Sequence, residues 1–459
     1  MPRRLQHIEA GLRAELAPMV RLAWPVATAE LGWMAMGLVD TMMVGRVSAE
    51  AMGAVSIGSH LFFAIAIFGI GMLLGLDYLI AHAFGAGRLH DARCALVQGV
   101  YLSLLLGALL TALLLAIVPR LEALGIQPVV ARQTTPYLHA LTWSMLPLLL
   151  YATLRRYLQA LGLVRAIMVA LISANAINAA VNWLLVFGNL GFPALGAEGS
   201  GWATTASRVY ILLFLLAYAA WHEHRSGAGL ALPWRFDRAR FLELVRLGLP
   251  AALQTGLEVG VFATATILAG RLAAVQLAAH QVALSAAAFT FMVPLGISSA
   301  AAVRVGHAMG RIDPRAAARA GWTALLLGGA FMSCAAVTFL TVPGWIIRVF
   351  TNEPTVVATG VALLGVAAIF QLFDGLQVVA TGALRGAGDT RTAMLANLIG
   401  HWVLGLPLGY ALCFWLDRGV IGLWIGLCTG LICVAAALIA AWSLRTRLQL
   451  ADYPVHRAA

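Results

Sequence analysis

Long apolar stretches alternate with short polar segments along the whole chain of 459 residues. A helix needs about 20 mostly apolar residues to cross the hydrocarbon core of a bilayer, and twelve stretches are suited to this. The first six stretches run over 22–44, 53–84, 97–118, 138–154, 166–187 and 202–221. The second six run over 247–269, 277–303, 320–339, 356–384, 393–415 and 420–442. The pattern predicts an all-α integral membrane protein with twelve transmembrane helices, the short fourth one allowing an earlier start.

The longest polar interruption divides these stretches six and six. It predicts an N-terminal lobe over 1–221, a cytoplasmic inter-lobe loop over 222–246 and a C-terminal lobe over 247–459. The first 21 residues alternate charged and apolar positions without an uninterrupted apolar core. We therefore expect an amphipathic cytoplasmic lead-in there, and not a cleaved signal peptide.

The two halves resemble one another at a nearly constant offset. Arg21-Leu-Ala-Trp-Pro25 matches Arg246-Leu-Gly-Leu-Pro250 at an offset of 225 residues, and the same offset relates Gly71 to Gly296 and 82–85 to 307–310. Repeats of six spans share one orientation, so we expect pseudo-two-fold symmetry about the membrane normal. Two such lobes favour transport by alternating access. Duplication also occurs in channels, and the transporter interpretation therefore also depends on the polar residues below.

Composition points to lipid as the solvent, because 61% of the residues are hydrophobic and only 11% are charged. All 30 basic residues are Arg. The absence of Lys from the sequence excludes a P-loop Lys and a Lys-based Schiff base within this chain, which argues against a self-contained ATP-driven pump. The five cysteines form no Cys-x-x-Cys pair and are interpreted as packing residues.

The net charge of +11 does not indicate a nucleic-acid partner, because the Arg residues follow the membrane topology. With the N-terminus inside, the opposite side holds only Arg46, Arg120, Arg132, Arg271, Arg348 and Arg418, and Arg208 lies inside a span. This bias predicts a multi-pass protein of a bacterial inner membrane with both termini cytoplasmic.

Two acids of the second half lie deep within spans, where an ionisable group costs about 2.5–3.5 kcal/mol on insertion scales. Gln254 shares a helical face with Glu258, and Gln371 and Gln377 share one with Asp374. We predict that Glu258 and Asp374 form an ion-coupling site for Na⁺ or protons. The alternative is that each is a structural acid bonded to a neighbour, although neither span contains a nearby Arg.

Asp40 is the first half's counterpart in kind, although not in repeat position, because the offset of 225 leads to Ala265. Asn178 and Asn182 lie four residues apart on one helical face, and Thr204 belongs to the sixth span. Together they predict a second proton or cation site, and interhelical hydrogen bonding without transport is an equal alternative. The roles of Glu30 and Asp77, toward the cytoplasmic ends of their spans, stay open, although Asp77 favours a structural role.

Further residues are candidates for the substrate path because they place amide, imidazole, thioether or aromatic groups within spans. They are Gln254, Gln371, Gln377, His280, Gln281, Met36 and Phe289. Such residues also serve commonly as packing or lipid-facing side chains, and a lone intramembrane His is usually one of these.

Several motifs together resemble the MATE family of multidrug and toxic compound extrusion transporters. They are Gly37-Leu-Val-Asp40-Thr-Met-Met-Val-Gly45, Ala279-His-Gln281-Val-Ala-Leu284 and the segment from Asp374-Gly-Leu-Gln377 to Leu384-Arg-Gly386-Ala-Gly-Asp389-Thr-Arg391. The resemblance is to the NorM-like branch, because Glu258 and Asp374 stand where that branch has its cation site. Asn182 departs from the DinF-like pattern, which has an acid there, and Phe370 stands where some NorM-like members have Tyr.

This resemblance implies an antiporter that exports organic cations against inward Na⁺ or H⁺ flow, with no ATP and no cofactor. The alternative is a flippase for a lipid or lipid-linked precursor, which would be expected to line its cleft with several Arg. An intramembrane enzyme is disfavoured, because the sequence has no Gly-x-Ser-x-Gly, Gly-x-Gly-Asp or His-Glu-x-x-His motif. Expected partners are small organic cations and membrane lipid, and we expect a monomer.

Overall fold

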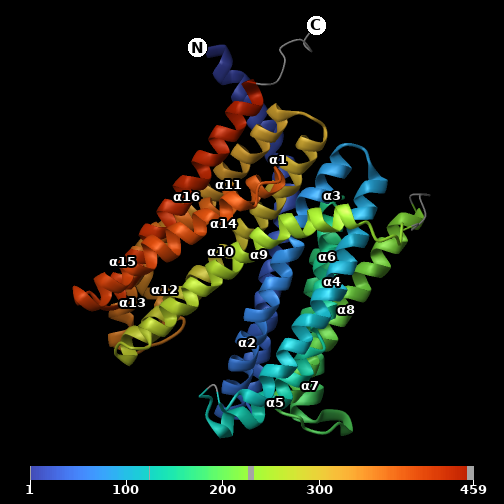
Figure 1. The fold of residues 1–459 in the computed structure, drawn as a ribbon. Coiled ribbons are helices and arrows are strands. Elements are labelled where there is room, and N and C mark those ends of the chain that lie inside the picture. Colours follow the sequence, from blue (N-terminus) through green and yellow to red (C-terminus); the bar gives the residue numbers. More distant parts are fainter. Residues whose placement is uncertain (1, 124, 226–231, 452–459) are drawn as a thin grey trace. The chain divides into compact units, whose positions relative to one another are not determined.

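A computed structural model describes residues 2–123, 125–225 and 232–451, with side chains from residue 14 onward. The centre of the expected inter-lobe loop, at 226–231, and the ends of the chain, at 1 and 452–459, lie outside the described residues. The described part is helical, and no strand occurs in it (Figure 1).

The helices follow the expected apolar stretches. The first half forms α1 (Pro2–Val44), α2 (Ala49–Leu73), α3 (Gly75–Gly85), α4 (Leu89–Ile117), η1 (Val118–Arg120), α5 (Pro128–Thr142), α6 (Met145–Ala160), α7 (Val164–Phe187), η2 (Asn189–Gly191) and α8 (Ala197–Arg225). The second half forms α9 (Arg238–Ala269), α10 (Ala274–Gly310), α11 (Pro314–Thr341), α12 (Pro343–Arg348), α13 (Pro354–Gly386), α14 (Arg391–Asn397), the π-helix η3 (Leu398–Gly405), α15 (Leu406–Tyr410), the π-helix η4 (Ala411–Trp415) and α16 (Gly419–Ala451).

Within the described residues, eleven helical segments are long and apolar enough to cross a membrane, and the bent pair α5–α6 brings the number to twelve. This confirms the predicted all-α membrane fold. The fourth span differs in detail from the sequence prediction, because it begins at Pro128 and bends by 43° between Thr142 and Met145. Pro147 has no amide hydrogen to donate to the carbonyl of Trp143, four residues earlier, so the helix cannot continue regularly through this point.

Contacts divide the chain into two compact units. The N-terminal unit comprises 28–80 and 88–252, and the C-terminal unit comprises 1–27, 81–87 and 253–459. Three helices therefore belong to both units: α1 changes unit two residues after Pro25, α3 changes unit after Ile80, and α9 changes unit two residues after Pro250. The lobe boundaries expected from the sequence repeat, 1–221 and 247–459, stay a prediction.

Each unit contains one copy of the same close helix contact. In the N-terminal unit, a Cβ atom on Gly71 would lie 2.5 Å from Cα of Ala252. In the C-terminal unit, a Cβ atom on Gly296 would lie 2.7 Å from Cα of Ala27. Only glycine permits backbones to approach this closely. Both partners of the first contact are related to those of the second by the offset of 225, so the sequence repeat recurs as a repeated contact.

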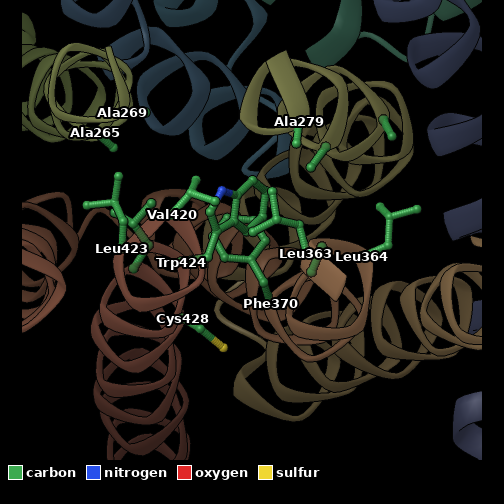
Figure 2. Close-up of a cluster of buried hydrophobic side chains, with 14 of the residues drawn as sticks. Ala265, Ala269, Ala279, Leu363, Leu364, Phe370, Val420, Leu423, Trp424 and Cys428 are labelled. Atoms are coloured by element: carbon green, nitrogen blue, oxygen red, sulfur yellow. The ribbon is translucent and has the colours of Figure 1, made fainter. Parts of the chain in front are cut away.

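The core of the C-terminal unit lies among α10, α11, α13 and α16, which pack side by side (Figure 1). At one end of it, the ring of Phe370 on α13 meets the indole of Trp424 on α16 edge-on, with centroids 5.5 Å apart (Figure 2). Phe262 of α9 contacts the same Phe370 ring at 5.9 Å. Offset and edge-on aromatic contacts of this kind fix how the helices pack. Phe370, which stands where some NorM-like members have Tyr, is thus an apolar core residue and is 2% exposed.

Candidate ion-coupling and substrate sites

Glu258 of α9 is held by two amides. The Nε2 atom of Gln254, one turn earlier on the same helix, donates to Oε2 at 2.8 Å. The Nε2 atom of Gln377 on α13 donates to Oε1, also at 2.8 Å. Each carboxylate oxygen therefore accepts a hydrogen bond from a neutral amide. The carbonyl oxygen of each amide can still bind another partner.

Asp374 lies one turn before Gln377 on α13 and is 6% exposed. It interacts electrostatically with Glu258 and accepts a hydrogen bond from Gln377. Gln377 is thus the link between the two acids. No salt bridge to Glu258 or Asp374 occurs in the part of the chain that the structure describes. Two carboxylates at this depth without a positive partner are a site that a cation stabilises.

Three unpaired oxygen atoms lie on α13, the helix that carries Asp374. The Oε1 atoms of Gln371 and Gln377 and the Oγ1 atom of Thr381 are buried without a hydrogen-bond partner in the structure. A buried acceptor left unpaired costs about 1–3 kcal/mol, so such atoms usually have a ligand or water in the working protein. Hard cations prefer carboxylate, amide and hydroxyl oxygens. The donor set therefore fits Na⁺ as a transported ion, and the carboxylates alone fit a proton.

Asp40 of α1 is the centre of a second cluster, within the N-terminal unit. Its Oδ1 atom accepts from Nδ2 of Asn178 at 3.0 Å and from Nδ2 of Asn182 at 2.7 Å, both on α7. Its Oδ2 atom accepts from Oγ1 of Thr204 on α8 at 2.7 Å. The structure thus brings together all four residues predicted for this site. Their part in transport stays a prediction.

Comparison with known proteins identifies the family. The MatE family profile matches residues 25–184 and 250–411. The chain belongs to the MatE family. It is 38% identical over 456 residues to the probable multidrug resistance protein NorM of Mesorhizobium japonicum, covering 96% of this chain and 98% of that protein. It is 35% identical over 424 residues to the multidrug resistance protein NorM of Aliivibrio fischeri, covering 91% of this chain and 92% of that one.

Solved structures share the MatE fold. A eukaryotic MATE transporter has a TM-score of 0.85 at 22% identity, covering 96% of this chain and 99% of its own. An outward-facing multidrug resistance MATE family transporter has a TM-score of 0.86 at 19% identity, covering 95% and 97%. These matches confirm the family resemblance and the fold predicted from the sequence motifs.

The substrate-path candidates of this MatE chain occupy different environments. Gln254 and Gln377 bind Glu258, whereas Gln371 donates to Thr290 of α10. The others are Met36, 4% exposed, Phe289, 59% exposed, and Gln281, also exposed. Exposure in a membrane helix is shared by lipid-facing and path-lining residues, so the predicted role of the last two stays a prediction.

His280 of α10 is fully buried, and both of its ring nitrogens are engaged. Nε1 of Trp424 donates to Nδ1 of His280 at 3.0 Å, and Nε2 of His280 lies 3.0 Å from Oγ1 of Thr266. Since an indole nitrogen only donates, Nδ1 is the acceptor, and Nε2 carries the proton of a neutral ring. Oγ1 of Thr266 in turn donates to the carbonyl of Phe262. The histidine joins α9, α10 and α16, an arrangement suited to packing.

Sequence reasoning did not find the partners of two further acids. Glu30 of α1 forms an ion pair with Arg155 of α6, and Asp77 of α3 pairs with Arg156 at 3.4 Å. All four residues belong to the N-terminal unit. The adjacent Arg155 and Arg156, at the end of the fourth span, were the only signal in the sequence. Buried pairs of this kind support a structural role for Glu30 and Asp77.

Proposed function

We propose that this chain is a multidrug efflux antiporter that exports organic cations by alternating access, in exchange for Na⁺ or protons that enter the cell. The observation that carries the proposal is the pair Glu258 and Asp374, joined by Gln377 and without a positively charged partner among the residues that the structure describes. The relatives named as multidrug resistance proteins support it. The Arg distribution supports a bacterial inner membrane and cytoplasmic termini, and the chain is proposed to act as a monomer.

Coupling follows from the charge of this pair. A bound cation offsets the repulsion between the two carboxylates, and when it leaves, at least one acid takes a proton or rearranges. An ion shifts the balance between two conformations only if it binds one of them more tightly. The unpaired oxygens of Gln371 and Gln377 supply that difference, because a small movement of α13 relative to α9 gains or loses them as ligands.

The test is transport by purified protein in sealed vesicles with Na⁺ and proton gradients imposed separately. A lipophilic dye monocation should move against its own gradient when one of the two ion gradients is present. Transport should stop when an ionophore collapses that gradient. Dye transport that persists without any ion gradient would contradict the proposal.

A further inference from the structure

His60 of α2 is an exposed histidine inside a membrane-spanning helix. It follows Ala49, the first residue of α2, by about 17 Å along the helix axis, near the middle of a hydrocarbon core about 30 Å thick. An intramembrane histidine almost always faces the interior of a helix bundle or a water-filled space. Because the side chain of His60 is exposed, it does not face the interior of its bundle. A water-filled space is the environment that remains.

The ring of His60 is oriented by the backbone of its own helix. Its Nδ1 atom lies 2.6 Å from the carbonyl oxygen of Ser56, one turn earlier. A carbonyl oxygen only accepts, so Nδ1 carries the proton of the neutral ring and Nε2 keeps its lone pair. Within the described structure, no other group bonds to this ring. The Nε2 atom is therefore an acceptor without a partner, on an exposed side chain of α2.

The second half of the chain repeats this arrangement. The offset of 225 residues relates Ser56 to Gln281 and His60 to Ser285. Oγ of Ser285 donates to the carbonyl oxygen of Gln281 at 2.8 Å, just as Nδ1 of His60 donates to that of Ser56. Gln281 is exposed as well, and it is a candidate for the substrate path. Two corresponding polar pairs on exposed faces of spans favour a ligand-binding role over an accidental lipid-facing histidine.

The exposed face of α2 around His60 is otherwise apolar. Phe63, one turn later, is 40% exposed, and Met52, two turns earlier, is 43% exposed. Phe62, whose ring contacts the guanidinium of Arg208, is only 1% exposed and belongs to the opposite, buried side of the helix. An aromatic ring and a thioether beside a hydrogen-bond acceptor suit an organic cation, because ring faces attract positive charge.

We propose that His60 is a substrate-binding residue of the N-terminal unit and that it selects protonated amines. Its Nε2 atom accepts a hydrogen bond from the ammonium N–H, while Phe63 and Met52 contact the organic part of the molecule. A quaternary cation has the same charge but no N–H, so it lacks this hydrogen bond. The inference deepens the proposed efflux of organic cations and rests on it.

The test compares monodansylcadaverine, a fluorescent primary ammonium, with its N,N,N-trimethyl derivative, which has the same charge and no ammonium N–H. Equilibrium binding of each dye to the purified protein in phosphatidylcholine nanodiscs is followed by dansyl fluorescence. Losing one hydrogen bond to a charged group corresponds to about tenfold in affinity. His60→Phe and His60→Leu should therefore weaken binding of the primary ammonium about tenfold. Each should change binding of the trimethyl dye by less than about threefold.

Two further variants complete the design. His60→Gln keeps a neutral acceptor and should bind the primary ammonium within about threefold of the wild type. His139→Phe removes another exposed imidazole of the same unit, on α5, and should weaken binding of neither dye. The headgroup of phosphatidylcholine has no N–H, so a lipid ammonium cannot replace the dye in this assay. A preference for the primary ammonium that appears only after phosphatidylethanolamine is added would make the lipid the ligand and the inference wrong.

The outcomes separate the inference from the function on which it rests. Unchanged affinities in both apolar variants, or equal losses for the two dyes, would overturn the inference alone. Failure of the wild type to bind the primary ammonium would do the same. The efflux function is tested apart from this, by gradient-driven transport of the trimethyl dye, which cannot cross a bilayer as a neutral amine. If the wild type binds both dyes but does not transport the trimethyl dye, the proposed efflux function fails.

Discussion

The two acidic clusters of this MatE protein differ in how their charge is balanced. In the N-terminal unit, Asp40 has three neutral donors and lies near Arg208, so the cluster carries one negative and one positive charge. In the C-terminal unit, Glu258 and Asp374 share Gln377 and no basic partner among the described residues. One cluster contains its own counter-charge, and the other requires one from outside.

This difference bears on which unit binds the coupling ion. A pair of buried carboxylates without a counter-charge gains most from a small cation, and its oxygen-rich surroundings favour Na⁺ or a proton. We therefore propose ion coupling in the C-terminal unit, whereas the predicted proton or cation site around Asp40 stays a prediction.

The largest expected effect is the loss of coupling. Glu258→Gln and Asp374→Asn are nearly isosteric and remove a charge from the membrane interior, so expression should be kept or improved. Gradient-driven efflux of a dye cation should nevertheless fall almost to background. Glu353→Gln, which neutralises an exposed acid of the same unit, is the matched control and should transport normally. Normal efflux by both site variants would refute the coupling site.

A stability effect should distinguish the paired acids from the transporting ones. Glu30→Gln leaves the buried Arg155 without its carboxylate, and breaking a buried ion pair by removing one partner costs about 3–5 kcal/mol. The thermal midpoint in detergent should therefore fall markedly. Glu258→Gln, at a residue with no ionic partner in the described part of the chain, should change the midpoint little. Equal midpoints for the wild type and Glu30→Gln would show that this pair does not support the unit.

A smaller effect should measure the charge balance inside the N-terminal unit. Asp40→Asn leaves Arg208 without a nearby anion, and Arg208→Met removes that cation as well. A double-mutant cycle on unfolding stability should give a coupling of about 0.5–3 kcal/mol, the double variant being less destabilised than the sum of the two single ones. Strictly additive changes in unfolding free energy would show that Asp40 and Arg208 do not interact.

The smallest effect on export concerns the hydrogen-bond chain through His280. Thr266→Val removes one partner of the ring, which should cost about 1–3 kcal/mol of stability because a buried donor is left unpaired. Dye selectivity should not change, since the ring lies in the core and is fully buried. A change in the relative export of different dyes by Thr266→Val would instead assign His280 to the substrate path.

Much of the architecture could be predicted because membrane spans are determined by local composition. Twelve apolar stretches give twelve spans, and acids within them are conspicuous in any sequence. Helical spacing alone places Gln254 beside Glu258 and Asn178 beside Asn182. These features depend on residues a few positions apart, where periodicity is informative.

Other features depend on residues far apart in the sequence and could not be predicted. The partners Glu30 and Arg155 are 125 positions apart, and periodicity contains no information about such contacts. Nothing in the sequence indicated that Ser144, at the helix break before Pro147, would accept a hydrogen bond from Arg208. Sequence analysis identified Arg208 as an intramembrane charge, but only the structure shows that two aromatic rings and a hydroxyl group contact it.

The central claim is that Glu258 and Asp374 couple the movement of the ion to the movement of the drug. It is tested most directly by letting a drug gradient drive the ion. An outward gradient of a dye cation is imposed on vesicles containing purified protein, and Na⁺ and proton movements are recorded without any imposed ion gradient. The account predicts ion movement opposite to the dye for the wild type, and none above protein-free vesicles for Glu258→Gln or Asp374→Asn. Dye-driven ion movement of wild-type size in both variants would contradict it.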